Sequence, residues 1–220
     1  MKDRIRGMFA AFISGFLFSG IEAKEADVEA ATVVCFGDSI TKRGYPEIMG
    51  KALGVKVVNA GVAGHTSAEG LRRIRKDVLD LHPDVVVIFF GTNDARVDAP
   101  HKFVPAGKYE AVLTEMVKEI EKIDAKVVIC TLPPIDEAAY FERHETALYD
   151  EAGGTTKLWS GYRAAAMKVA KEQNLPVVDL YTELEKEADW LSPDGVHPSK
   201  EGCRIIARMV GEKVEPLLNE

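Results

Sequence analysis

Three short segments, far apart in the chain, carry residues whose types and spacing suit nucleophilic catalysis. They are Gly37-Asp38-Ser39, the run from Gly91 to Asp94, and the run from Asp194 to Pro198. Together they offer a serine hydroxyl, an amide that can donate to a developing oxyanion, and an Asp-x-x-His pair. We therefore expect the chemistry of a serine hydrolase.

The Ser39 hydroxyl is the candidate nucleophile, and it needs a base because a serine hydroxyl reacts poorly near neutral pH. His197 is the candidate base. The Asp-x-x-His spacing lets one turn of loop bring the Asp194 carboxylate to Nδ1 of His197, which leaves Nε2 for the serine. We predict a catalytic triad of Ser39, Asp194 and His197.

Charge that builds up on a substrate carbonyl oxygen needs fixed hydrogen-bond donors. The candidates are the backbone N–H groups of Ser39 and Gly64 and the side-chain amide of Asn93. A glycine suits this position because it lets the backbone approach a substrate closely. The neighbours of these donors are candidate substrate contacts: Asp38, His65 and Asp94.

Each segment also has a plainer interpretation. Gly-Asp-Ser is a common turn, Asn93-Asp94 can cap a loop, and Asp194-Gly195 is a favourable turn dipeptide. His65 can equally be a structural residue. Independent turns would not be expected to supply a complete triad with its oxyanion donors, so their joint occurrence favours a catalytic site.

The elements that must position these residues follow from the hydrophobic pattern. Continuous valine-rich runs, typical of strands covered on both faces, span residues 32–36, 55–59, 84–90, 126–131 and 176–180. Helical patterns span residues 45–53, 67–80, 107–123, 156–174 and 199–218. This alternation predicts a parallel sheet with right-handed crossovers, whose ligands bind beyond the carboxyl ends of the strands. The glycine-containing segments follow the first three strands at that edge.

The composition is that of one globular domain. The chain has 220 residues, 46% of them hydrophobic, and a formal net charge of -7. An acidic chain is a poor candidate for nucleic-acid binding or for attachment to anionic lipid. We expect a neutral or weakly polar substrate, such as a small-molecule or carbohydrate ester, as the partner, and the pattern does not define an oligomeric state.

The first residues differ from the rest of the chain. Lys2, Arg4 and Arg6 precede an apolar run at residues 8–18, followed by small and polar residues, which is the order found in a secretory signal peptide. The run is too short for a membrane span, which needs about 20 apolar residues. We predict a signal peptide over 1–26, a catalytic domain over 27–220, no stable membrane insertion after cleavage, and a secreted or periplasmic protein. An uncleaved anchor or an amphipathic N-terminal helix is the alternative.

The chain has three cysteines, Cys35, Cys130 and Cys203. Their odd number and wide spacing argue against a disulfide framework or a zinc site. We expect three small buried side chains, although export leaves one pairing open.

Taken together, these motifs resemble the SGNH hydrolase superfamily, also called GDSL esterases and lipases, over nearly all of the mature chain. Ser39 is similar to the nucleophile of the first sequence block, Gly64 and Asn93 to the oxyanion donors of the second and third, and Asp194 and His197 to the pair of the fifth. The resemblance implies a three-layer α/β/α, flavodoxin-like fold with a five-stranded parallel sheet. It also implies ester hydrolysis through an acyl-enzyme, without metal or cofactor.

The substrate is less sharply defined, because one fold hosts many activities. The Gly-Asp-Ser-Ile-Thr form, in which Ile40 replaces the frequent leucine, and the compact size are similar to short-acyl and carbohydrate esterases of the superfamily. We expect an acetyl esterase acting on acetylated carbohydrate. Specificity is expected in residues 133–158, either as a lid or as a plain surface excursion.

Three alternatives have different activities. The first is a lysophospholipase or thioesterase on the same scaffold. The second is a secreted glycan-binding protein of the same fold without turnover. The third is a flavodoxin-like cofactor-binding module, which would leave Asn93, Asp194 and His197 without a task.

Overall fold

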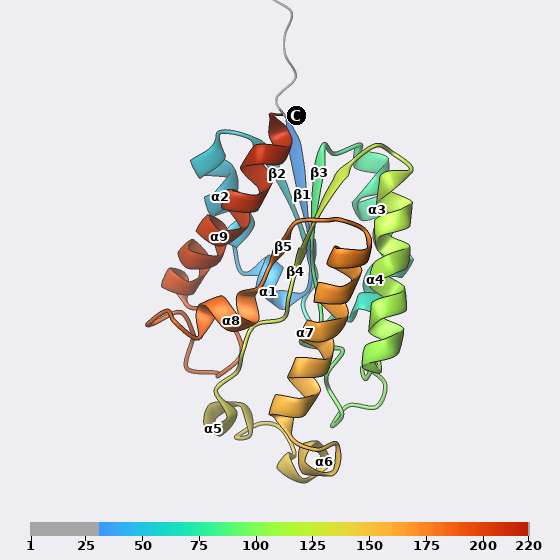
Figure 1. The fold of residues 1–220 in the computed structure, drawn as a ribbon. Coiled ribbons are helices and arrows are strands. Elements are labelled where there is room, and N and C mark those ends of the chain that lie inside the picture. Colours follow the sequence, from blue (N-terminus) through green and yellow to red (C-terminus); the bar gives the residue numbers. More distant parts are fainter. Residues whose placement is uncertain (1–30, 220) are drawn as a thin grey trace, which may run out of the picture.

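The structure is a computed structural model that describes residues 31–219. Its centre is a five-stranded sheet in the order β2-β1-β3-β4-β5, with every neighbouring pair parallel. The strands are β1 (Thr32–Gly37), β2 (Lys56–Gly61), β3 (Val85–Phe89), β4 (Lys126–Cys130) and β5 (Val177–Val178). Helices cover both faces of the sheet (Figure 1). The predicted three-layer α/β/α class is confirmed.

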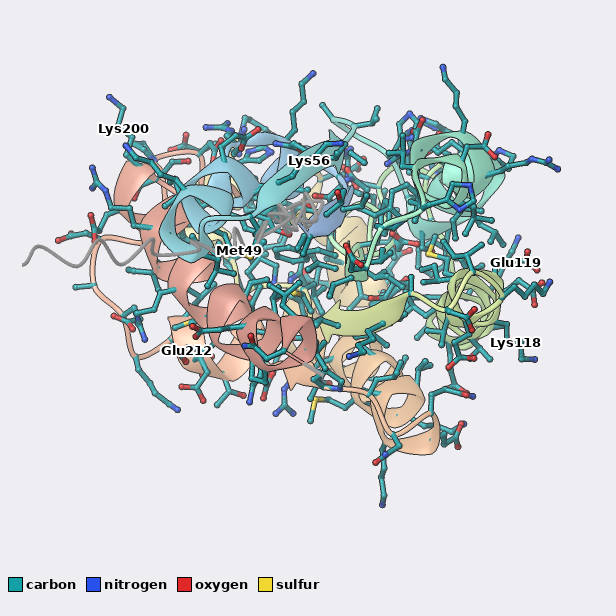
Figure 2. The ribbon with its side chains drawn as sticks, turned by 90° about the horizontal axis from the view of Figure 1, so that it is seen from above. Met49, Lys56, Lys118, Glu119, Lys200 and Glu212 are labelled. Carbon is teal, nitrogen blue, oxygen red and sulfur yellow. The ribbon has the colours of Figure 1, made fainter. Side chains whose placement is uncertain are left out.

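Two groups of helices form the outer layers. On one face α2 (Tyr45–Leu53) packs against α9 (Lys200–Leu218), with α8 (Leu180–Leu184) near the start of α9. On the other face α3 (Ser67–Asp77), α4 (Ala106–Glu121) and α7 (Thr155–Glu172) lie side by side. Figure 2 shows Lys118 on the outer surface of α4 and Lys200 at the start of α9, far from each other on the two layers.

The strands supply both hydrophobic cores because successive side chains point to opposite faces of a sheet. Val34 and Phe36 of β1 join the core beneath α3, α4 and α7, whereas Val33 and Cys35 join the core beneath α2 and α9. All four side chains are fully buried. This explains the continuous apolar runs of β1 and β3, which are almost entirely buried, whereas the edge strand β2 is only partly buried.

The structure differs from the prediction in its short elements. It adds α1 (Ser39–Lys42), α5 (Glu137–Tyr140), α6 (Thr146–Glu151) and the 3₁₀ helix η1 (Leu79–Leu81). The predicted fifth strand was too long: β5 has only two residues, because Asp179 turns away to pair with Arg163 and Leu180 already begins α8. The three cysteines are buried and free, as expected.

Two predictions about the N-terminus lie outside the described residues, namely the signal peptide over 1–26 and its cleavage. Within residues 31–219, no helix combines the length and the apolar character that crossing a bilayer requires.

Candidate active site

The nucleophile candidate lies where β1 turns into α1, at the carboxyl edge of the sheet (Figure 1). Asp38 caps this short helix, with its Oδ1 accepting a hydrogen bond of 2.8 Å from the Ile40 amide. The cap fixes the first turn of α1, and Ser39 is its first residue. Sequence periodicity does not reveal α1, because four residues are too few to display a helical repeat.

Ser39, His197 and Asp194 form a continuous hydrogen-bonded chain. The distance from His197 Nε2 to Ser39 Oγ is 2.8 Å, and that from His197 Nδ1 to Asp194 Oδ2 is also 2.8 Å. The two bonds use opposite nitrogens of the imidazole ring, which is the arrangement that a serine nucleophile and its base require. The structure thus brings together three residues that are up to 158 positions apart.

The Asp194 carboxylate is held in place by its own loop. Its Oδ1 accepts hydrogen bonds from Ser192 Oγ at 2.7 Å, from the His197 amide at 2.9 Å and from the Val196 amide at 3.1 Å. Partial burial opposes ionisation, but these donors hold the pKa of Asp194 below its usual range. Asp194 is therefore a carboxylate at neutral pH, fixed against the imidazole.

The loop that carries His197 is closed by backbone contacts before α9 begins. The Ser192 amide donates to the His197 carbonyl at 2.8 Å, and Leu191 bridges to Pro198. Ser199 then caps α9 by accepting a bond of 3.0 Å from the Gly202 amide. These contacts fix the histidine between two anchored points.

The three candidate oxyanion donors differ in their present partners. The backbone N–H groups of Ser39 and Gly64 have no acceptor among residues 31–219, and Gly64 has a φ of +75°, which favours glycine. The Asn93 amide instead has two acceptors, the Asp38 carboxylate at 3.2 Å and the His65 carbonyl at 3.1 Å. Donation from Asn93 to a substrate oxygen would therefore require the exchange of one bond.

Asp38 and Asp94 do not face the site, contrary to the prediction that they contact substrate. Asp38 is only 1% exposed and Asp94 is fully buried. Burial raises the pKa of Asp38 to about 7, and burial raises that of Asp94 to about 6. Asp94 accepts from the backbone and the hydroxyl of Ser67. Both carboxyl groups join neighbouring segments from behind the site.

His65 is tied to α3 by Arg73, a residue that no sequence motif marks. Arg73 Nε donates to His65 Nδ1 at 3.2 Å, and the Arg73 guanidinium also donates to the carbonyls of Gly37 at 2.8 Å and Ala60 at 2.9 Å. Burial and the neighbouring Arg73 lower the pKa of His65. His65 is partly exposed and follows Gly64, which lines the cavity described next, so its contact with substrate stays a prediction.

A cavity of about 280 Å³ opens beside Ser39. Its wall includes the candidate oxyanion residues Gly64 and Asn93 as well as His197. Thr92 also lines it, and the Thr92 hydroxyl is buried with no hydrogen-bond partner among the described residues. The rest of the wall combines the apolar Ala63 and Val196 with the polar side chains of Arg96, Tyr140, Arg143 and His144.

The segment of residues 133–158 supplies Tyr140, Arg143 and His144 to the outer part of this wall. Tyr140 stacks on His144 with 3.9 Å between ring centroids, and its hydroxyl bonds to that of Tyr149 at 2.9 Å. Trp159 anchors the segment by donating from Nε1 to the Pro133 carbonyl at 3.1 Å. The excursion is therefore packed by its own aromatic rings and presents Arg143 and His144 to the cavity.

Comparison with protein families matches residues 35–205 to the GDSL-like Lipase/Acylhydrolase family. Among curated proteins, the chain is 31% identical to "Isoamyl acetate-hydrolyzing esterase 1 homolog" of Mus musculus, over 79% of this chain and 77% of the relative. It is 30% identical to an acetylxylan esterase of Geobacillus stearothermophilus, over 74% and 72% respectively. It is 26% identical to the uncharacterized lipoprotein YqeF of Bacillus subtilis (strain 168), over 89% and 92%.

Solved structures of a lipase/acylhydrolase and of an acetyl xylan esterase have a similar fold. The lipase/acylhydrolase from Enterococcus faecalis superposes with a TM-score of 0.72 at 28% identity, covering 84% of this chain and 96% of that chain. The acetyl xylan esterase AlAXEase superposes with a TM-score of 0.70 at 26% identity, covering 83% and 99%.

Proposed function

The chain belongs to the GDSL-like Lipase/Acylhydrolase family and is a carboxylic ester hydrolase; from that premise we propose that it removes acetyl groups from carbohydrate, with Ser39 as the nucleophile. The observation that carries the proposal is the pair of 2.8 Å bonds that link Ser39 Oγ to His197 and His197 to Asp194.

In the proposed first half-reaction, His197 Nε2 takes the proton from Ser39 Oγ as the oxygen attacks the ester carbonyl. The backbone N–H groups of Ser39 and Gly64 stabilise the resulting oxyanion, and Asn93 joins them. Collapse of the tetrahedral intermediate breaks the bond to the alcohol, which leaves with the proton held by His197. The products are the free alcohol and an acyl ester of Ser39.

In the second half-reaction, water replaces the alcohol. His197 accepts a proton from the water as its oxygen attacks the acyl carbonyl, and the proton returns to Ser39 Oγ as the acid leaves. Asp194 accepts from Nδ1 throughout, so it selects the tautomer that keeps Nε2 available and stabilises the imidazolium.

A short acyl group suits the volume of the site. The cavity of about 280 Å³ lies below the range of about 300–1,000 Å³ that is usual for drug-sized ligands. The names of two relatives and one solved structure support the same acyl group, since isoamyl acetate and acetylxylan share acetyl and differ in the alcohol. The polar side chains of Arg96, Tyr140 and Arg143 in the wall favour a hydroxyl-rich alcohol such as a sugar.

We further propose that the protein works outside the cytoplasm. The basic and then apolar order of residues 1–26 supports export. The description of the Bacillus subtilis relative as a lipoprotein is consistent with an exported protein.

The test is hydrolysis of p-nitrophenyl esters from acetate to decanoate by the purified protein, with Ser39→Ala and His197→Ala beside it. We expect the highest kcat/KM with acetate, and a loss of about 10³-fold or more in kcat in each variant. The double variant should lose little more than either single variant, because the two residues act as a unit.

The contrary outcomes are distinct. A maximum with decanoate would favour a lysophospholipase or thioesterase. Full activity of Ser39→Ala would remove Ser39 from the reaction. Binding of acetylated xylan by the wild-type protein without release of acetate would favour a glycan-binding protein.

A further inference from the structure

The wall of the cavity beside Ser39 contains two arginines, although the whole chain is acidic. They are Arg96 and Arg143, and no aspartate or glutamate among residues 31–219 lines this cavity. The chain as a whole carries a net charge of -7, with 35 acidic residues against 28 lysines and arginines. A wall of the opposite sign to the rest of the protein indicates selection for an anionic ligand.

Asp98, which is bonded to Arg96 and His144 of this wall, is itself nearly buried. The Asp98 side chain is only 8% exposed and accepts hydrogen bonds from Arg96, from Tyr149 and at His144 Nδ1. Burial opposes ionisation, but these partners lower the pKa of Asp98 below its usual range. Its charge is therefore used to hold Arg96 and His144 in position from behind.

Both arginines keep N–H groups for a ligand. Arg96 donates to Asp98 from Nε at 2.8 Å and from Nη2 at 3.0 Å, which leaves Nη1 without a protein acceptor among residues 31–219. Arg143 donates only from Nη2, to the Asp194 carbonyl, and within the described part of the chain it meets no carboxylate. The Arg143 side chain is exposed at the mouth of the cavity. A guanidinium fork of this kind matches the geometry of a carboxylate.

A second cavity continues the positive charge beyond the catalytic loop. It has a volume of about 520 Å³ and is lined by Arg43, Lys200 and Arg204, again without a carboxylate in its wall. Arg43 lies 3.4 Å from Asp194, and Arg204 pairs with Glu201. Lys200 has no ion-pair partner among residues 31–219, and Figure 2 shows its side chain extending into solvent. The two cavities flank the loop that carries Asp194 and His197.

We propose that the substrate carries a carboxylate close to the acetyl ester, as in an acetylated oligosaccharide that contains uronate residues, and that Arg143 and Arg96 bind this carboxylate. The proposal rests on the proposed function, since it names the alcohol half of the same ester. Carboxylates on neighbouring sugar units of the oligosaccharide reach Arg43 and Lys200 on the far side of the loop.

The test compares two substrates that differ only in charge. One is an acetylated galacturonate oligosaccharide, and the other is the same material after methyl esterification of its carboxylates; acetate release gives kcat/KM for each. We expect wild-type protein to prefer the charged form, and Arg143→Gln to lower the ratio of the two kcat/KM values about tenfold. The preference should also weaken as salt is added.

Arg75→Gln is the matched control. Arg75 lies near the end of α3, and its side chain is 87% exposed. The substitution removes the same charge as Arg143→Gln, at a residue that does not line the cavity. We expect it to leave both kcat/KM values unchanged. A similar fall in the ratio for both variants would mean that net charge, and not the Arg143 fork, determines the preference, which would overturn the proposal.

The remaining outcomes separate this proposal from the esterase assignment. Equal hydrolysis of both oligosaccharides, with a ratio that Arg143→Gln does not change, overturns the carboxylate site and leaves the acetyl esterase intact. Hydrolysis of p-nitrophenyl acetate but of neither oligosaccharide does the same. Failure with p-nitrophenyl acetate as well overturns the proposed function itself.

Discussion

Replacing Arg73 should impair catalysis although Arg73 lies outside the cavity wall. Its side chain is 13% exposed and stacks over Phe36, with the guanidinium carbon 4.4 Å from the ring centroid. It donates to the Gly37 carbonyl, which directly precedes the nucleophile turn, and to the Ala60 carbonyl near the end of β2. We expect Arg73→Met to let these two segments move relative to each other.

The expected loss of stability depends on which hydrogen bonds each acceptor of Arg73 keeps in the Arg73→Met variant. The Gly37 carbonyl still accepts from the Val62 amide at 3.1 Å. Asp77, whose Oδ2 accepts from Arg73 Nη1 at 2.8 Å, is 26% exposed and can turn to water. The Ala60 carbonyl and the His65 ring lose a charged donor, each worth about 1.5–3 kcal/mol. Loss of the stacking on Phe36 adds about 1 kcal/mol, and the retained methionine stem recovers part of the packing. Ala60 and His65 are only half-buried, so water replaces part of each lost bond, and we expect a decrease of about 2–4 kcal/mol in the free energy of unfolding.

The catalytic effect should be larger in kcat than in KM, because a displacement of about 1 Å in a reacting group costs up to about 10²-fold in rate. We expect kcat for p-nitrophenyl acetate to fall about 10- to 100-fold, with KM changed less than threefold. Arg73→Lys should restore little, since one ammonium group cannot replace the planar fork that reaches several acceptors.

The assay uses steady-state kinetics together with urea unfolding, under conditions where near-ultraviolet circular dichroism shows folded protein. Arg72→Met is the control, because Arg72 is the exposed neighbour on the same helix and has no bonded partner within the described chain. A folded Arg73→Met protein with kcat within twofold of wild type would refute the positioning role.

Two further predictions concern backbone packing and pH. A Cβ at Gly61 would lie 2.3 Å from the Lys42 amide nitrogen, so Gly61→Ala should displace α1. We expect it to lower kcat at least tenfold and to destabilise the fold by about 1–3 kcal/mol. The control is Gly107→Ala, which has no atom within 4 Å of its Cβ and should stabilise α4 by about 0.5–1 kcal/mol. Wild-type kinetics in the Gly61 variant would contradict this reasoning. The raised pKa values of Asp38, about 7, and Asp94, about 6, mean that the folded protein keeps protons that the unfolded chain has released. The free energy of unfolding should therefore fall as the pH rises from about 5 to about 7.5. The lowered pKa of His65 acts in the opposite direction, but the two carboxyl groups together outweigh it. Urea titrations that show a flat or rising free energy of unfolding over this range would contradict the prediction.

The sequence indicates the sheet and the motif residues because both leave local patterns. The valine runs predict four strands to within two residues at each end, and the Asp-x-x-His spacing predicts the bond between Asp194 and His197. The fifth strand is overestimated because Leu180 is apolar in either a strand or a helix. Four- to six-residue helices such as α1 and α6 are invisible to periodicity, since they complete fewer than two turns.

Burial of a polar residue is a tertiary property, and this is where the sequence misleads. Asp38 and Asp94 stand beside Ser39 and Asn93 in the chain, so proximity suggests that they meet the substrate. In the structure each points into the protein and accepts hydrogen bonds from another segment. Sequence neighbours of a site residue can therefore lie behind the site, depending on the local backbone turn.

The residues behind the site are connected by hydrogen bonds, which explains why the sequence motifs contain more residues than the reacting groups. Asp38 accepts from Asn93, Asn93 donates to the His65 carbonyl, the His65 ring accepts from Arg73, and Arg73 donates to the Gly37 carbonyl beside Asp38. This closed ring ties the ends of β1, β2 and β3 to α3. Because the donors proposed for the oxyanion sit on those three ends, their spacing depends on every bond in the ring. Arg73 is the member that no motif marks, since only packing of α3 against β1 brings its guanidinium to the loops. Substitution of Arg73 or of Asp38, neither of which lines the cavity, should therefore lower kcat, and the two losses should not add.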